Sequence, residues 1–195
     1  MNLVIIKYNA GNVQSVSFAL QRLGIEPVVT DDFEQILKAD KVIFPGVGEA
    51  STAMKYLKEK QLDKLIPQLK QPTLGICLGM QLMCNYSEEN DTECMGIFNL
   101  KVKRFIDDSV NKIPHIGWNN ITDLKGPLYE NIENNSFVYF VHSYYAELGK
   151  DAIAKTNYIV PFSSSLNKNN FYGTQFHPEK SGKTGNQILQ NFLNL

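Results

Sequence analysis

In Pro72-Thr-Leu-Gly-Ile-Cys77-Leu-Gly-Met-Gln81, the sequence changes from a strand pattern to a helix pattern around one cysteine. Residues 72–76 have the apolar character of a short buried strand, and residues 80–84 resemble the start of an apolar helix. A cysteine at such a corner, with glycine two residues to either side, has the form of a nucleophile elbow with sulfur in place of a hydroxyl. We therefore expect a strained backbone at Cys77 and a thiolate favoured by the helix N-terminus. The alternative is a buried structural cysteine.

A nucleophilic cysteine needs a base, and one of the three histidines has a carboxylate in a suggestive place. His177 and Glu179 are separated by Pro178, so in an extended segment both side chains point to the same side. One ring nitrogen of His177 can take the thiol proton while the other donates to Glu179, which fixes the tautomer. The pattern predicts a Cys-His-Glu triad. The alternatives are a core or loop histidine and a solvated carboxylate.

The loop Phe44-Pro-Gly-Val-Gly48 follows an apolar strand over 41–44. Gly48 can reach positive φ at little cost, so the peptide before it can rotate and aim an N–H group into a pocket. Together with the N–H of Leu78, the residue after the nucleophile, this loop is a candidate oxyanion hole. The alternative is an ordinary glycine-rich turn between a strand and a helix.

Strand and helix patterns alternate through the first eighty residues, which indicates a parallel sheet with helices on both faces. The expected strands cover 3–6, 27–30 and 41–44, and the expected helices run from Asn12 to Gly24, from Asp31 to Leu37, and over 49–59 and 61–69. Asn12 and Asp31 are the candidate helix N-caps.

After about residue 95 the sequence becomes rich in strand patterns. The stretches 99–105, 136–147 and 152–161 predict further, partly antiparallel strands, and Asn167–Asn170 predicts a hairpin turn. A final helix has an apolar face formed by Ile188, Leu189, Phe192 and Leu193. The predicted fold is an open, largely parallel α/β sheet flanked by helices with added antiparallel strands, in one domain over 1–195. Ligands of such sheets bind beyond the carboxyl ends of the strands.

Composition limits the function further. The 195 residues are 43% hydrophobic with a net charge of −1, which suits one sizeable core and gives no basis for binding nucleic acid or an anionic membrane. The three cysteines lack metal-ligand spacing, and the first residues lack the pattern of a signal peptide. We expect reduced thiols in the cytoplasm, no metal and no cofactor.

Gly75-Ile-Cys77-Leu-Gly-Met-Gln81 together with His177-Pro-Glu179 resembles the class I (triad) glutamine amidotransferases, whose sheet is flavodoxin-like. Within that family the chain is most similar to the glutaminase subunits of imidazole glycerol phosphate synthase, from histidine biosynthesis. The segments that carry this similarity are Tyr8–Asn12, Pro45–Gly48, Pro114–Asn119, Tyr139–Tyr144 and Gln175–Ser181. The chain departs from the family at Lys7, where an acidic residue is more usual, and at Ala10, in a loop often richer in glycine.

The resemblance implies hydrolysis of glutamine to glutamate and ammonia, within a synthase complex that acts as a lyase. Ammonia would pass to a (β/α)8-barrel cyclase that forms a heterodimer with this chain. The implied roles are catalysis by Cys77, His177 and Glu179, an oxyanion hole at Gly48 and Leu78, glutamine binding by Gln81, Ser143 and Tyr144, and partner contact by Asn12, Trp118, Tyr139 and Lys180.

Two other readings stay open from the sequence. One is a related amidotransferase that serves pyridoxal phosphate or another pathway, against which the Gly117-Trp-Asn119 segment argues. The other is a non-catalytic binding or stress protein on the same scaffold, since fold does not fix function. The His177-Pro-Glu179 segment argues against it.

Overall fold

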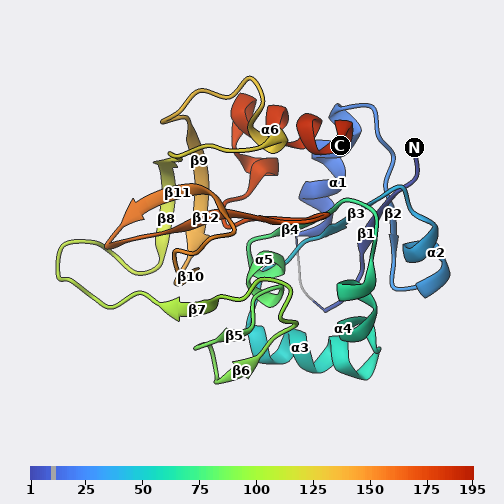
Figure 1. Cartoon of the computed structure of the whole chain (residues 1–195), viewed down its shortest axis with the longest axis horizontal. Coiled ribbons are helices and arrows are strands. Elements are labelled where there is room, and N and C mark those ends of the chain that lie inside the picture. Colours follow the sequence, from blue (N-terminus) through green and yellow to red (C-terminus); the bar gives the residue numbers. More distant parts are fainter. Residues whose placement is uncertain (10–11) are drawn as a thin grey trace.

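The computed structural model describes residues 1–9 and 12–195. The departure noted at Ala10 lies outside the described residues. A seven-stranded sheet crosses the molecule in the order β11-β12-β13-β4-β3-β1-β2 (Figure 1). Its strands are β1 (Leu3–Ile6), β2 (Val28–Thr30), β3 (Lys41–Phe44), β4 (Thr73–Ile76), β11 (Ala152–Tyr158), β12 (Val160–Lys168) and β13 (Phe171–Thr174).

The five strands from β13 to β2 are parallel, and β12 and β11 are added antiparallel at one end. This confirms the predicted mixed sheet. Every residue of β1, β3 and β4 is buried, as expected for parallel strands that are covered on both faces. The carboxyl ends of four neighbouring strands, β13, β4, β3 and β1, therefore meet at one rim of the sheet.

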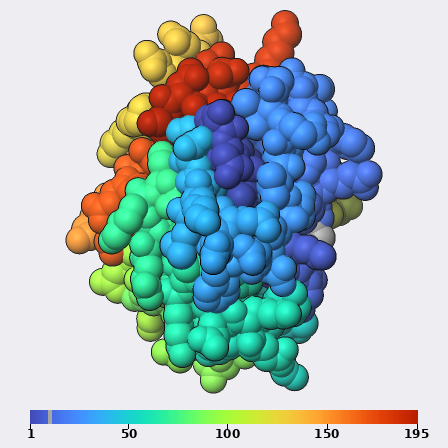
Figure 2. Space-filling view, turned by 90° about the vertical axis from the view of Figure 1, so that its right-hand side faces the viewer, coloured from blue at the N-terminus to red at the C-terminus, as the bar shows by residue number. Residues whose placement is uncertain are grey.

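Helices cover both faces of the sheet, as predicted. The helices are α1 (Val13–Arg22), α2 (Phe33–Lys38), α3 (Ala50–Glu59), α4 (Leu62–Leu65), α5 (Leu78–Leu82) and α6 (Gly182–Asn194), with short 3-10 turns η1 (Ile66–Gln68), η2 (Pro127–Tyr129) and η3 (Pro178–Lys180). Figure 2 faces the blue N-terminal edge, with the red C-terminal helix on one side and the teal α3–α4 region on the other.

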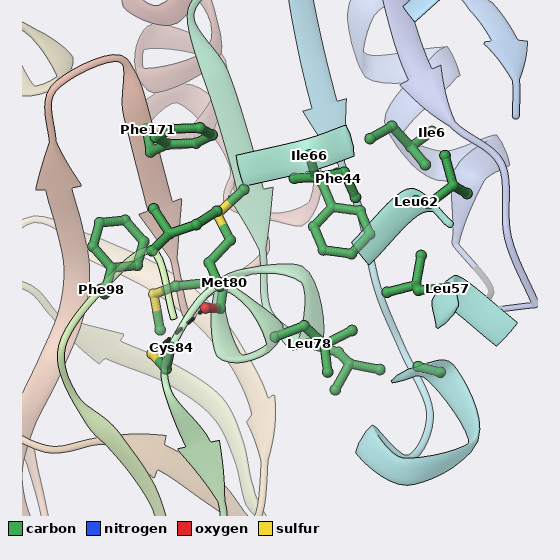
Figure 3. Close-up of a cluster of buried hydrophobic side chains, with 14 of the residues drawn as sticks. Ile6, Phe44, Leu57, Leu62, Ile66, Leu78, Met80, Cys84, Phe98 and Phe171 are labelled. Atoms are coloured by element: carbon green, nitrogen blue, oxygen red, sulfur yellow. Dashed lines mark hydrogen bonds between the residues drawn. The ribbon is translucent and has the colours of Figure 1, made fainter. Parts of the chain in front are cut away.

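Each face has its own hydrophobic core. One core joins α1 and α6 to the sheet, and the apolar face predicted for the last helix, Ile188, Leu189, Phe192 and Leu193, is buried there. The other core joins α3, α4 and α5 to the opposite face. Figure 3 shows Leu78 and Met80 of α5 in this second core with Phe44 of β3 and Leu57 of α3.

Two small sheets lie beside the main one. The strands β5 (Tyr86–Ser87), β6 (Thr92–Glu93), β7 (Lys101–Arg104) and β10 (Tyr144–Ala146) form one of them in the order β10-β7-β5-β6. The strands β8 (His115–Asn120) and β9 (Phe137–His142) pair as an antiparallel ribbon. The β-rich character predicted after residue 95 is confirmed, and the turn predicted over 167–170 joins β12 to β13.

Some local predictions were wrong. Asp32, not Asp31, caps α2, because its carboxylate accepts from Gln35 N–H at 2.9 Å. Asn12 makes no side-chain cap for α1: its backbone is left-handed, with φ 75°, rather than extended as in a typical N-cap, and its NH2 group donates to Glu179. The single helix predicted over 61–69 is a four-residue α4 followed by the 3-10 turn η1, in which Pro67 lies.

Within the described residues, no helix combines the length and apolar character that a membrane span requires.

Candidate active site

Cys77 lies between β4 and α5 in the strained conformation that the elbow pattern predicts, with φ 54° and ψ −111°. Its N–H donates to the carbonyl oxygen of Thr174, the last residue of β13, at 2.7 Å. The glycine two residues on is required, because a Cβ on Gly79 would lie 1.9 Å from the carbonyl oxygen of Phe44. The sequence prediction of an elbow is therefore confirmed.

His177 and Glu179 face each other as the two-residue spacing predicts. His177 Nδ1 lies 2.8 Å from Glu179 Oε1, and both side chains are buried. His177 is extended and Pro178 starts the 3-10 turn η3, so the chain bends immediately after the histidine. The side-chain amide of Asn12 also donates to Glu179 Oε1. His177 Nε2 is buried and has no hydrogen-bond partner among the described residues, so it is available for chemistry.

The electrostatics link His177 to the cysteine. Burial acts to lower the pKa of His177, but the neighbouring sulfur of Cys77 and the carboxylate of Glu179 raise it above its ordinary value. A raised pKa keeps the imidazole protonated beside the sulfur. This is the arrangement that a thiolate–imidazolium pair needs.

The other two thiols have a different environment. Cys84 is buried in the core next to α5, where its sulfur donates to the carbonyl oxygen of Met80 at 3.7 Å (Figure 3). Burial raises the pKa of Cys84, and it raises the pKa of Cys94 to about 12. Neither thiol is ionised near neutral pH, so neither competes with Cys77 as a nucleophile. All three cysteines are free.

The loop after β3 is held at both ends. Tyr8 donates its hydroxyl to the carbonyl oxygen of Pro45 at 2.6 Å, and Glu49 accepts from the N–H groups of Ser51 and Thr52 at the start of α3. Gly48 between these anchors is exposed and has φ 125°, in the region that favours glycine. The rotation expected at this glycine is therefore sterically allowed.

The predicted oxyanion donors are not both free. Leu78 N–H donates to the carbonyl oxygen of Gly46 at 3.3 Å, so the loop itself occupies one of the two donors. A bond of this length is weak and can be exchanged for a stronger acceptor. In this structure, one of the two predicted donors is therefore engaged by the loop.

A cavity of about 270 Å³ lies over the elbow. Its lining brings together the predicted residues Cys77, Gly48, Leu78, Gln81, Ser143 and Tyr144, and adds Val47, Glu89, Val141 and His142. Gln81 directs its NH2 group inward, toward the carbonyl oxygen of Tyr144 and toward Gln175 Oε1, each at 2.9 Å. Among the described residues, no cluster of His, Cys, Asp or Glu could hold a metal ion.

Sequence reasoning missed two polar residues of this region. Glu89 lines the cavity, accepts from Ala50 N–H at 2.8 Å, and has a carboxyl pKa raised by burial. No local pattern marks it. Gln175 is fully buried against Cys77, and here a signal existed, because it lies only two residues before His177.

The residues expected at a partner interface divide into two groups. Trp118 and Tyr139 are paired across the β8–β9 ribbon with ring centroids 6.0 Å apart, and Trp118 is 55% exposed rather than core. Lys180 is exposed on η3. Asn12, by contrast, is half-buried and donates to Glu179.

The backbone of Tyr139 connects the ribbon to the segment that carries His177. Its carbonyl oxygen accepts from His177 N–H, and its own N–H donates to Ser181 Oγ, each at 2.9 Å. A displacement of the exposed ribbon would therefore move the backbone of the histidine.

The other two histidines form a buried neutral pair. His115 Nδ1 lies 3.0 Å from His142 Nε2, and His142 Nδ1 lies 2.7 Å from the carbonyl oxygen of Tyr144. Because a carbonyl only accepts, His142 donates from Nδ1 and accepts at Nε2. The ring of His115 stacks between Phe140 and Tyr158. Burial lowers the pKa of His115 to about 4 and that of His142 to about 3, so neither is a base candidate.

A cysteine at a strained strand-to-helix turn beside a buried His–Glu pair is the arrangement expected of an amide hydrolase with a cysteine nucleophile, and comparison with known proteins identifies the class. The sequence model of the family "Glutamine amidotransferase class-I" matches residues 4–195. The chain belongs to this family.

Three individual relatives in this family have the same name. The chain is 56% identical to "Imidazole glycerol phosphate synthase subunit HisH" of Bacteroides fragilis strain YCH46, with 100% of both chains covered. It is 55% identical to the protein of the same name from Bacteroides thetaiotaomicron, again over 100% of both. Against the HisH subunit of Haemophilus influenzae strain Rd, identity is 46%, over 99% of this chain and 97% of the relative.

Solved structures support the fold. A putative GMP synthase protein from Thermoplasma acidophilum has a TM-score of 0.76 and 19% identity, covering 100% of this chain and 93% of that one. PurLQS from Thermotoga maritima has a TM-score of 0.74 and 17% identity, covering 99% and 97%. At this identity, the likeness concerns the fold alone.

The buried histidine pair predicts a pH-dependent stability. An unfolded histidine takes up a proton below a pH of about 6.5, whereas the folded pair resists protonation until well below that. The free energy of unfolding, measured with urea, should therefore fall between pH 7 and pH 5. His115→Phe keeps the stacking but removes one titrating group, so its stability should fall less over the same interval. An equal fall in both proteins would contradict the neutral pair.

Proposed function

We propose that Cys77, His177 and Glu179 form the triad with which this chain, a glutaminase subunit of imidazole glycerol phosphate synthase in histidine biosynthesis, hydrolyses glutamine to glutamate and ammonia. The observation that carries the proposal is the geometry around His177. One ring nitrogen is held by Glu179 at 2.8 Å, and the other is buried without a hydrogen-bond partner in the described residues. The sulfur of the elbow cysteine is close enough to raise the pKa of this histidine.

The reaction follows from these positions. The thiolate of Cys77 attacks the side-chain amide carbon of glutamine, and His177 gives its Nε2 proton to the leaving ammonia. Water then attacks the thioester, while His177 takes a proton from it, and glutamate leaves. Glu179 keeps the imidazole oriented and stabilises its charged form in both steps.

We place the glutamine substrate in the cavity over the elbow. Ser143, Tyr144 and the oxygen end of Gln81 are available there as polar contacts. Glu89 supplies a carboxylate at the same cavity, which suits the ammonium group of an amino acid. Gly48 and Leu78 complete the oxyanion hole once the bond from Leu78 to Gly46 is exchanged.

The partner is a (β/α)8-barrel cyclase that binds this chain as a heterodimer and receives its ammonia. The exposed apolar face of the β8–β9 ribbon supports this placement, because Ile116, Trp118 and Phe137 are each more than half exposed there. Lys180 next to this face offers a charge for a carboxylate of the partner. We further propose that residues 1–195 act as one amidotransferase domain, in the cytoplasm where the three free thiols remain reduced.

Replacing the nucleophile tests the proposal directly. Cys77→Ser should abolish glutamine hydrolysis while leaving the fold and partner binding intact, because an unactivated hydroxyl is a far poorer nucleophile than a thiolate. Glutamate release is the measurement, and mass spectrometry after treatment with a glutamine-like electrophile should place the adduct on Cys77. An adduct on Cys84 or Cys94, or an active serine variant, would refute the assignment.

Removing the charge of Glu179 tests the rest of the triad. Glu179→Gln should lose a large part of the rate with little loss of stability, since the amide cannot stabilise an imidazolium. The corresponding change in a serine protease costs about 10⁴-fold. His177→Ala should lose more, and steady-state kinetics on both variants measures this. If His142→Ala were damaging and His177→Ala harmless, the base would be wrong.

The isolated chain should be a poor glutaminase that is strongly stimulated when the barrel partner binds its own ligand. A missing oxyanion donor costs roughly 10²–10³ in rate, and Leu78 N–H is occupied in this structure. The measurement is glutamate production with and without the liganded barrel, for wild type and Lys180→Ala. We expect the variant to bind the partner less tightly and to be less stimulated. Full activity of the isolated chain, or no complex, would instead indicate a free-standing glutaminase.

A further inference from the structure

We infer that Gln175 is a further catalytic residue, whose side-chain N–H donates to the sulfur of Cys77 and stabilises the attacking thiolate. This inference rests on the proposed role of Cys77 as the nucleophile. Gln175 Nε2 lies 3.6 Å from Cys77 Sγ, and Gln175 is fully buried directly after β13. The contact therefore joins a buried amide to the reacting atom.

Neighbouring groups fix which end of the Gln175 amide faces the sulfur. The carbonyl oxygen of Tyr144 can only accept, so Gln81 must present its NH2 group to it at 2.9 Å. The same NH2 group also lies 2.9 Å from Gln175 Oε1. Because the oxygen of Gln175 is held toward Gln81, its NH2 group is the end that faces Cys77.

The network continues beyond Tyr144. Its carbonyl oxygen also accepts from His142 Nδ1 at 2.7 Å, and His142 Nε2 accepts from His115 Nδ1 at 3.0 Å. Asn119 Nδ2 lies 3.4 Å from the remaining nitrogen of His115, on the β8 strand. Two arms of the network therefore converge on the carbonyl oxygen of Tyr144, which accepts from both His142 and Gln81. Gln81 in turn donates to Gln175 Oε1, so the amide of Gln175 is oriented before substrate binds.

Packing alone does not explain an amide at this position. The backbone of the segment is secured without the side chain, because Gln175 N–H donates to the carbonyl oxygen of Ser164 at 2.9 Å. Burying an amide is costly unless its groups are hydrogen-bonded, and an apolar residue of similar size would fill the same volume. The NH2 group of Gln175 instead donates to the sulfur of Cys77.

The donor acts at two points of the reaction. It stabilises the negative sulfur before attack on glutamine. When water cleaves the thioester, a carbon–oxygen bond forms and the carbon–sulfur bond breaks. The electron pair of the carbon–sulfur bond returns to the sulfur of Cys77, and His177 takes the proton from water. The same N–H of Gln175 then donates a hydrogen bond to the negative sulfur.

The test is the alkylation of Cys77 by iodoacetamide as a function of pH, on the full chain, with the adduct located by mass spectrometry. In Gln175→Met the donor is lost at similar volume, so the thiol–thiolate equilibrium should shift about tenfold. The pH midpoint should rise by about one unit. The less stabilised thiolate is also more nucleophilic, so the plateau rate should rise about threefold while the rate below the midpoint falls about threefold.

Gln187→Met is the matched control. It makes the same exchange in α6, where the amide of Gln187 donates to Asn191 Oδ1 at 2.8 Å. This variant should keep the wild-type profile. Gln81→Met, which leaves Gln175 in place but removes the group that orients it, should give a partial shift in the same direction.

The outcomes separate the two proposals. Preferential alkylation of Cys84 or Cys94 in the wild-type chain would refute the nucleophile itself. Alkylation of Cys77 with coincident profiles for wild type and Gln175→Met would show that Gln175 only fills space. If circular dichroism shows that Gln175→Met is unfolded, the Gln81→Met profile decides, and an unshifted midpoint there overturns the inference.

Discussion

The hydrogen bond from Cys77 N–H to the carbonyl oxygen of Thr174 is the interaction on which the rest of the site depends. It extends the parallel pairing of β4 and β13 by one residue, at 2.7 Å, into the turn that carries the sulfur. A backbone held in such a sparsely populated region costs of order 1–3 kcal/mol and persists only where the surroundings over-determine it. Here the sheet supplies one constraint and the close contact of Gly79 with Phe44 supplies another.

The polar groups around the elbow form a connected network rather than a set of separate pairs. Buried amides and imidazoles are costly unless each donor has an acceptor, and the path from His115 to Gln175 satisfies this condition along its length. His177 Nε2 and Glu179 Oε2 are among the buried atoms that have no partner in the described part of the chain. Both belong to the triad that we propose.

The sequence contained enough to predict the parts of the site that depend on local geometry. The elbow follows from glycines near Cys77, the His177–Glu179 contact from a two-residue spacing, and their meeting from strands that end at one rim. Features that depend on tertiary contacts could not be predicted. The side chain of Asn12 looked like a helix cap and instead reaches Glu179, and Glu89 enters the cavity from a short hairpin without a pattern of its own. Pairing of His115 with His142 requires the β8–β9 ribbon, whose register no local pattern gives.

The position of β13 near the end of the chain affects when the enzyme becomes active during synthesis. Gln175 and Cys77 are 98 residues apart in sequence, yet they touch in the folded protein. A ribosome that adds about 5–20 residues per second exposes the elbow several seconds before the strand that brings its base. A chain that stops before Thr174 lacks the carbonyl oxygen that accepts from Cys77 N–H, as well as the His177–Glu179 pair. Formation of this turn as the structure shows it therefore has to wait until nearly the whole chain has been made.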